Sequence, residues 1–184
     1  MNYRCIKPNI GGLCFGCLFL RCCRGSQPGT PGLHACPCAA TGELVVNGGM
    51  ENGFAGWSTA GPLTIDTARA QVHTGNAAAA MFNGAVLSQI VPIEGGCFYS
   101  LSFHGRGDGA NVTLMAVVIF LSDAGSSLGL QLEVRAGDIP NVYTSYNKLS
   151  AAAPADAVAA EIVFSVKSTG NQFFNLDDVS FSVQ

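Results

Sequence analysis

The chain has 184 residues, of which 48% are hydrophobic and only 11% are charged, and its formal net charge is -3. This length suits one domain with a tail, and the composition argues against a disordered chain or a coiled coil. A net negative charge gives no reason to expect nucleic-acid binding. The 23 glycines and 8 prolines instead favour many short strands joined by turns.

The N-terminal part differs sharply in charge from the rest of the chain. Residues 1–42 contain four basic residues and no acid, giving +4: Arg4, Lys7, Arg21 and Arg24. The remainder has five basic and twelve acidic residues, giving -7. A glycine- and proline-rich run at 25–32 cannot continue a helix or pair as a central strand. We therefore expect an N-terminal arm with a linker at 1–42 and one domain at 43–184.

Residues 10–20 of the arm form an apolar run behind two basic residues. Its length matches the apolar region of a signal peptide, but no clear small-residue cleavage site follows it. A membrane-spanning helix needs about 20 apolar residues, so the run is too short to cross a bilayer. We expect neither a cleaved signal peptide nor a membrane span.

The arm is rich in cysteine, which allows three interpretations. It contains seven of the eight cysteines: Cys5, Cys14, Cys17, Cys22, Cys23, Cys36 and Cys38. We favour disulfides to a neighbouring subunit, because closely spaced cysteines bridge poorly to each other. Four thiolates around zinc, or reduced thiols without a structural role, are the alternatives. The eighth, Cys97, is either a buried apolar residue or the acceptor for an arm cysteine of another subunit.

From residue 43 onward the pattern predicts an all-β, two-sheet jelly-roll β-sandwich. The expected strands are 44–47, 63–68, 77–82, 86–91, 98–103, 114–121, 128–134, 143–149, 162–166 and 173–183. The run 114–121 is continuously apolar, which indicates a central strand covered on both faces or one that lines an interface. Residues 151–160 resemble a helix, but Pro154 interrupts them and we expect a loop.

Six short motifs follow one another in a recognisable order. They are NGGME at 47–51, GW at 56–57, GNAA at 75–78, LSQIV at 87–91, YSLSF at 99–103 and LDDVSF at 176–181. Together they resemble the galactose-binding-like jelly rolls, which include many carbohydrate-binding modules. The closest likeness is a Firmicute domain found N-terminal to collagen-like triplet repeats in spore and cell-surface proteins. This chain lacks the triplet array, so the resemblance implies a surface role rather than a collagen role.

The resemblance also implies a structural calcium ion. Its ligands would be Glu51 and either Asp177 or Asp178, with backbone carbonyls completing the oxygen shell that Ca²⁺ prefers. The alternative is that Asp178 only accepts hydrogen bonds from backbone N–H groups. In the family pattern Trp57 packs under a loop.

Sugar binding requires exposed aromatic rings beside a few polar groups. The candidate aromatic residues are Tyr143, Tyr146, Phe173 and Phe174, some of which alternation would place in the core. A role for them as a sugar platform is the weaker expectation.

Catalytic motifs are lacking in the sequence. His34, His73 and His104 lie in unrelated contexts, and no nucleophile elbow, zinc-protease helix or phosphate loop occurs. Asp177 and Asp178 are neighbours on an expected strand, so their side chains should point to opposite faces. We expect no enzymatic activity.

The favoured function is a structural subunit of a disulfide-cross-linked filament or layer on a spore surface. Jelly rolls would stack on copies of themselves while the arm docks on a neighbour, and disulfides would lock the polymer. The expected partners are the chain itself and other surface proteins or glycans, with no cofactor required beyond a possible structural calcium ion. The main alternative is a carbohydrate-binding module with an anchoring tail, and a third interpretation is an adaptor with a zinc-organised tail.

Overall fold

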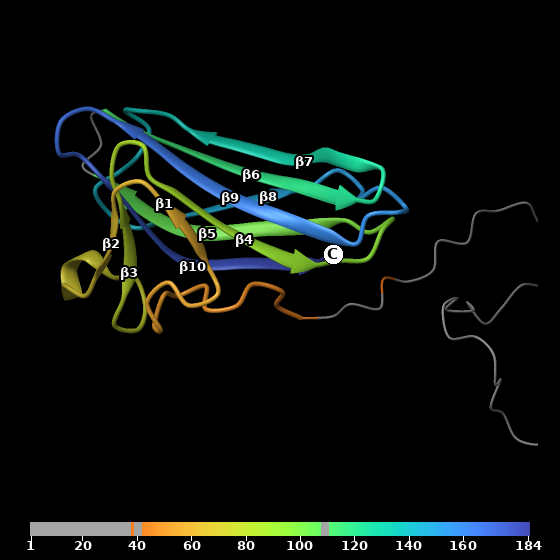
Figure 1. Ribbon diagram of the computed structural model, residues 1–184. Coiled ribbons are helices and arrows are strands. Elements are labelled where there is room, and N and C mark those ends of the chain that lie inside the picture. Colours follow the sequence, from red (N-terminus) through yellow and green to blue (C-terminus); the bar gives the residue numbers. More distant parts are fainter. Residues whose placement is uncertain (1–37, 39–41, 108–110) are drawn as a thin grey trace, which may run out of the picture. The chain divides into compact units, whose positions relative to one another are not determined.

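The computed structural model describes residues 38, 42–107 and 111–184, and these form a two-layer β-sandwich (Figure 1). The predicted all-β jelly-roll class is confirmed. The ten strands are β1 (Ser58–Ala60), β2 (Leu63–Asp66), β3 (Ala78–Met81), β4 (Val86–Pro92), β5 (Tyr99–Gly107), β6 (Val112–Ser122), β7 (Gly125–Val134), β8 (Thr144–Leu149), β9 (Ala159–Ser168) and β10 (Phe174–Val183). A short 3-10 helix, η1, spans Arg69–Gln71. No helix within these described residues is long and apolar enough to span a membrane.

The strands divide into two antiparallel sheets of five. Sheet 1 has the order β1-β4-β9-β6-β7, and sheet 2 has the order β2-β3-β10-β5-β8. Strict alternation of buried and half-buried residues runs through β5 and most of β6 and β9. Each of these strands therefore turns one row of side chains into the sandwich and the other row outward.

Aromatic side chains from both sheets fill the space between them. Phe103 of β5 meets Phe164 of β9 edge to face, with ring centroids 5.2 Å apart, which is a favoured aromatic geometry. Trp57 packs near Phe164, and its indole N–H donates to the carbonyl of Asn47 at 3.1 Å. The expectation that Trp57 packs under the loop is confirmed.

The N-terminal end of the domain differs from the prediction. Residues 44–47 form no strand, and the region makes only an isolated bridge between Glu43 and Ser182. Asn47 adopts a left-handed φ of 56°, which begins a turn instead of extending the chain. β1 was not predicted, because its three residues are all exposed and show no alternation.

The burial of β6 contradicts one of the two interpretations of the apolar run at 114–121, that of a central strand covered on both faces. One row of its side chains is fully buried between the sheets, but the outward row is only half-buried. The outward side chains on β6 are Met115, Val117, Ile119 and Leu121. The strand is therefore not covered on both faces, and its outer row belongs to an open apolar surface.

Two candidate inter-subunit cysteines are paired within one chain. Cys38 forms a disulfide with Cys97, with Cα atoms 6.0 Å apart, inside the range that a disulfide requires. This pairing corrects the prediction for Cys38 and Cys97, because Cys38 lies beside the loop between β4 and β5 of its own chain. The other six candidates, Cys5, Cys14, Cys17, Cys22, Cys23 and Cys36, lie outside the described residues, as does most of the predicted arm.

Candidate functional site

The segment between β2 and β3 crosses the outer face of sheet 2. Under it, the outward residues of β3 are alanines, and Ala78 and Ala80 are almost completely buried. The segment is attached to β10 by polar side chains: Asn175 donates from Nδ2 to the carbonyl of Gln71 at 3.1 Å. Small side chains on β3 thus let the segment lie close to the sheet, and β10 hydrogen bonds hold it there.

Asp177 and Asp178 of β10 both face this segment. Asp177 accepts hydrogen bonds from the backbone N–H groups of His73 at 2.9 Å and Thr74 at 3.3 Å. Asp178 accepts one from the Thr74 hydroxyl at 2.6 Å. The expectation that the two side chains point to opposite faces was wrong. Asp178 has a left-handed φ of 48° in a register shift between β10 and β5, and such a bulge redirects side chains.

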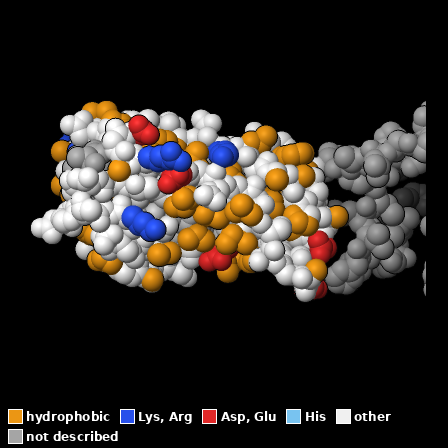
Figure 2. Space-filling view, turned by 90° about the horizontal axis from the view of Figure 1, so that it is seen from above, with side chains coloured by type: hydrophobic (Ala, Val, Ile, Leu, Met, Phe, Trp, Pro, Cys, Tyr) orange, Lys and Arg blue, Asp and Glu red, His pale blue; other side chains and the backbone are white. Residues whose placement is uncertain are grey.

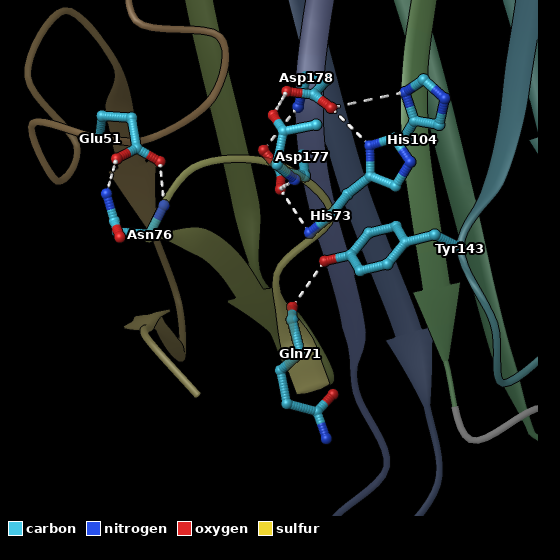
Figure 3. Close-up of polar contacts among 9 residues, drawn as sticks. Glu51, Gln71, His73, Asn76, His104, Tyr143, Asp177 and Asp178 are labelled. Atoms are coloured by element: carbon cyan, nitrogen blue, oxygen red, sulfur yellow. Dashed lines mark hydrogen bonds and ion pairs between the residues drawn. The ribbon is translucent and has the colours of Figure 1, made fainter. Parts of the chain in front are cut away.

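Two histidines meet beside these aspartates, as Figure 3 shows. The rings of His73 and His104 stack with centroids 3.9 Å apart and an angle of 13° between their planes. Nδ1 of His73 lies 2.6 Å from Oδ2 of Asp178, and Nδ1 of His104 lies 3.8 Å from the same oxygen. This cluster was not predicted, because the two histidines are 31 positions apart in the sequence and only the fold brings the segment over β5.

Tyr143 completes the aromatic part of the cluster. Its ring lies 5.1 Å from that of His73, and its hydroxyl donates to the carbonyl of Gln71 at 2.6 Å. Burial raises the pKa of the Tyr143 hydroxyl well above its usual range. The phenol therefore stays a hydrogen-bond donor at every physiological pH.

The carboxyl groups differ in their electrostatic environment. Burial raises the pKa of Asp177, although the N–H groups of His73, Asp178 and Thr74 oppose the shift. The backbone N–H of Asn76, which donates to Glu51 Oε1 at 2.8 Å, lowers the pKa of Glu51. Ala77 also donates to the same oxygen at 3.1 Å. Glu51 therefore ties the loop after Asn47 to the start of β3.

The three predicted calcium ligands border one small volume but do not all converge on it. A Cβ built on Gly49 would lie 3.7 Å from Oδ1 of Asp178 and 3.8 Å from Oδ1 of Asp177. The Cγ of Glu51 lies 4.0 Å from that position, but its carboxylate turns toward Asn76 (Figure 3). Asp177 Oδ1 and Oδ2 and Asp178 Oδ1 already accept hydrogen bonds from the protein, and Glu51 would have to reorient to join them at a Ca²⁺ ion. Calcium stays a prediction.

The predicted sugar-platform residues lie in three different places. Tyr143 belongs to the cluster on sheet 2. Tyr146 is half-buried and packs against the core, where its ring stacks on that of Phe103 with centroids 5.2 Å apart. Phe173 packs against Phe82 at 5.5 Å, and Phe174 is fully buried in the core.

A polar pocket of about 510 Å³ opens beside His73. This volume falls within the roughly 300–1,000 Å³ of small-molecule sites. Its lining residues are Thr67, Arg69, Val72, His73, Gly75 and Asn76. The pocket thus combines hydrogen-bond donors and acceptors with the edge of an aromatic cluster.

Several solved structures with a similar fold are carbohydrate-binding modules. A module named TmCBM61, solved in complex with β-1,4-galactotriose, is 20% identical with a TM-score of 0.63, covering 78% of this chain and 100% of that chain. A family 16 carbohydrate-binding module is 21% identical with a TM-score of 0.57, covering 75% and 98%. At such low identity the likeness establishes the jelly-roll fold alone.

One similar structure is described as enzymatically active. It is the active domain of tailspike protein 4 from bacteriophage CBA120, which is 19% identical with a TM-score of 0.61. The match covers 77% of this chain but only 21% of that one. No protein-family model matches the chain, and no curated protein sequence matches it. The absence of enzymatic activity therefore stays a prediction.

Proposed function

We propose that the sandwich is a carbohydrate-binding module that holds a glycan in the pocket beside His73. The observation that carries this proposal is the pocket itself, in which Arg69, Thr67 and Asn76 offer polar groups next to aromatic rings. Sugars are recognised by that combination of ring faces and directed hydrogen bonds. The similar structure of TmCBM61 holds β-1,4-galactotriose, which supports a glycan as the ligand class.

Arg69 is the residue that tests the proposal most directly. It is exposed on η1, so its removal should leave the fold intact. A hydrogen bond from a charged donor contributes roughly 1.5–3 kcal/mol, so Arg69→Ala should weaken glycan binding by about tenfold or more. Arg135→Ala, at an exposed arginine after β7 paired with Glu133, is the matched control.

The experiment is a glycan array probed with the full-length protein, with β-1,4-galactotriose among the probes, followed by calorimetry on any hit. We expect Arg69→Ala to lose binding and Arg135→Ala to retain it. An array without any hit, or equal loss in both variants, would contradict a glycan site in this pocket.

A structural calcium ion forms part of this proposal. It would join the Gly49 loop to β10 through Asp177 and Asp178, with Glu51 as the third side chain. Its contribution would be to stiffen the loop that carries Asn76, one of the pocket residues.

Self-assembly on a surface is a second candidate function, and the outer face of sheet 1 favours it. Beside the half-buried outward row of β6, Ile90 of β4 is 63% exposed and Leu128 of β7 is 60% exposed. Figure 2 shows hydrophobic side chains gathered over part of one face of the molecule, with several charged side chains beside them. Glu161 of β9 lies opposite both Ile90 and Ile119. Extended apolar patches of this kind are typical of protein contacts. We propose a second copy as the occupant, with the arm cysteines cross-linking the copies on a cell or spore surface.

A further inference from the structure

We propose that His73, His104 and Asp178 form a binding site for a divalent transition-metal cation, with Zn²⁺ as the best fit. Within the part of the chain that the structure describes, this is the only set of three histidine, cysteine or acidic side chains whose ligand atoms all lie within 4.8 Å of one another. The proposal does not require glycan binding, although His73 also lines the pocket. It shares one ligand, Asp178, with the calcium prediction, so its test uses calcium-free buffer.

The distances between the ligand atoms suit a tetrahedral ion. With metal-ligand distances of about 2.1 Å, two ligand atoms of a tetrahedral site lie about 3.4 Å apart. The two measured separations from Oδ2 of Asp178, 2.6 Å to His73 and 3.8 Å to His104, bracket that value. An imidazole nitrogen donates in the plane of its ring, so the stacked rings of His73 and His104 must rotate out of their nearly parallel arrangement before both Nδ1 atoms hold one cation.

His104 has a buried ring nitrogen without a hydrogen-bond partner at this place. Its Nδ1 is shielded from solvent and has no hydrogen-bond partner. A buried polar atom without a partner costs about 1–3 kcal/mol. A cation between the two imidazoles and Asp178 would satisfy this nitrogen and would replace the proton that the close contact between His73 and Asp178 requires.

The surroundings orient the ligands. The Thr74 hydroxyl donates to Oδ1 of Asp178, which leaves Oδ2 directed at the histidines. Outer hydrogen bonds of this type hold the ligands of metal sites in place. Asp177 lies next to Asp178 and adds a second negative charge, and the imidazole pair selects Zn²⁺, Ni²⁺ or Cu²⁺ over Ca²⁺ and Mg²⁺. Three protein ligands leave one position for water.

The test is metal titration of the full-length protein in calcium-free buffer after alkylation of any free thiols. Alkylation matters because cysteines of the arm are alternative zinc ligands, whereas the Cys38–Cys97 disulfide does not react. Co²⁺ serves as the probe, because its visible absorption reports tetrahedral coordination, and Zn²⁺ is then used to displace it. We expect one ion per chain.

Three variants locate the site. His73→Gln and His104→Gln should each weaken Co²⁺ binding at least tenfold, and Thr74→Val should weaken it by about tenfold through loss of orientation. His34→Gln, the third histidine, is the matched control and should bind like the wild type. Circular dichroism verifies that each variant is folded.

Two outcomes would overturn the proposal. The first is binding that occurs only before alkylation, which would assign the metal to arm thiolates. The second is equal affinity in the wild type and a His73→Gln/His104→Gln double variant. Because Arg69→Ala leaves all three ligands in place, a negative glycan result does not affect this test.

Discussion

Gly48 and Gly49 are adjacent in sequence but differ in what surrounds them. A Cβ on Gly48 would lie 2.0 Å from the carbonyl oxygen of Val179, a backbone atom that cannot move aside. The two backbones are also hydrogen-bonded here, because the Val179 N–H donates to the carbonyl oxygen of Gly48 at 3.0 Å. A Cβ on Gly49 would meet nothing closer than 3.7 Å. The first glycine is required by close packing on β10, and the second is not.

We therefore predict that Gly48→Ala lowers the free energy of unfolding by about 1–3 kcal/mol, the usual cost of overpacking. Gly49→Ala, the matched control, should change it by much less. Urea unfolding monitored by Trp57 fluorescence measures both. Equal stability of the two variants would contradict the close approach of residue 48 to β10.

Glu51 allows the calcium prediction to be tested through stability. A cation that binds only the folded state raises the melting temperature, so calcium should stabilise the wild type relative to chelator. Glu51→Gln should reduce this difference, and it should also lower stability in chelator, because the amide accepts fewer hydrogen bonds from Asn76 and Ala77. Identical melting of the wild type with calcium and with chelator would exclude a structural ion.

The disulfide joins two elements that are far apart in sequence. Cys38 precedes the first bridge to β10, and Cys97 is buried in the loop between β4 and β5. The sequence separation is 59 residues, and a closed loop of that length is associated with roughly 4 kcal/mol of stabilisation by reduced entropy of the unfolded chain. The bond thus secures the start of the domain to sheet 2.

We expect Cys38→Ser to lower the free energy of unfolding by about 4 kcal/mol under oxidising conditions. Cys97→Ser should lower it at least as much, and the double variant should resemble Cys97→Ser, because the two residues act as one unit. Denaturant titration of the three variants gives these values. An additive loss in the double variant would show that the cysteines are not bonded to each other.

Assembly depends on the complete domain, because the outer face of sheet 1 combines residues of several strands. Val117→Lys would place a charge on this face directly opposite Val163 of β9 and Gln131 of β7, neither of which is an acid that could pair with it. Ser102→Lys, on the outward row of β5 in sheet 2, is the matched control.

We predict that the wild type forms oligomers under reducing conditions, that Val117→Lys shifts them to monomer, and that Ser102→Lys does not. Analytical ultracentrifugation measures the distribution, and non-reducing gel electrophoresis reports additional cross-links. A wild type that stays monomeric at high concentration, with no reducible ladder, would contradict self-assembly.

Much of the sandwich was predictable because alternation is a local property. A strand with one buried face must repeat every second residue, and the residue types of β5 and part of β9 follow that period. β6 alternates only in burial, because its sequence at 114–121 is apolar throughout. The ends of these strands were less predictable. β5 extends to Gly107 and β9 begins at Ala159, and the alternation of burial continues there through the polar residues Arg106 and Glu161, which do not stand out as strand residues in the sequence. Those strand ends are set by hydrogen bonding to the neighbouring strands and not by residue type.

The candidate site depended on contacts that no local pattern contains. His73 and His104 became neighbours because the segment after β2 folds over sheet 2, and Asp177 and Asp178 came to face the same side through a bulge. Likewise, the bond between Cys38 and Cys97 could not be predicted, because the two residues are 59 positions apart in sequence and only the fold places them side by side. Residue types and their periodicity were sufficient for the all-β class and most strands, since each strand follows from its own residues. Residue types and periodicity were not sufficient to predict which side chains contact each other, since those contacts depend on the three-dimensional path of segments that are distant in sequence.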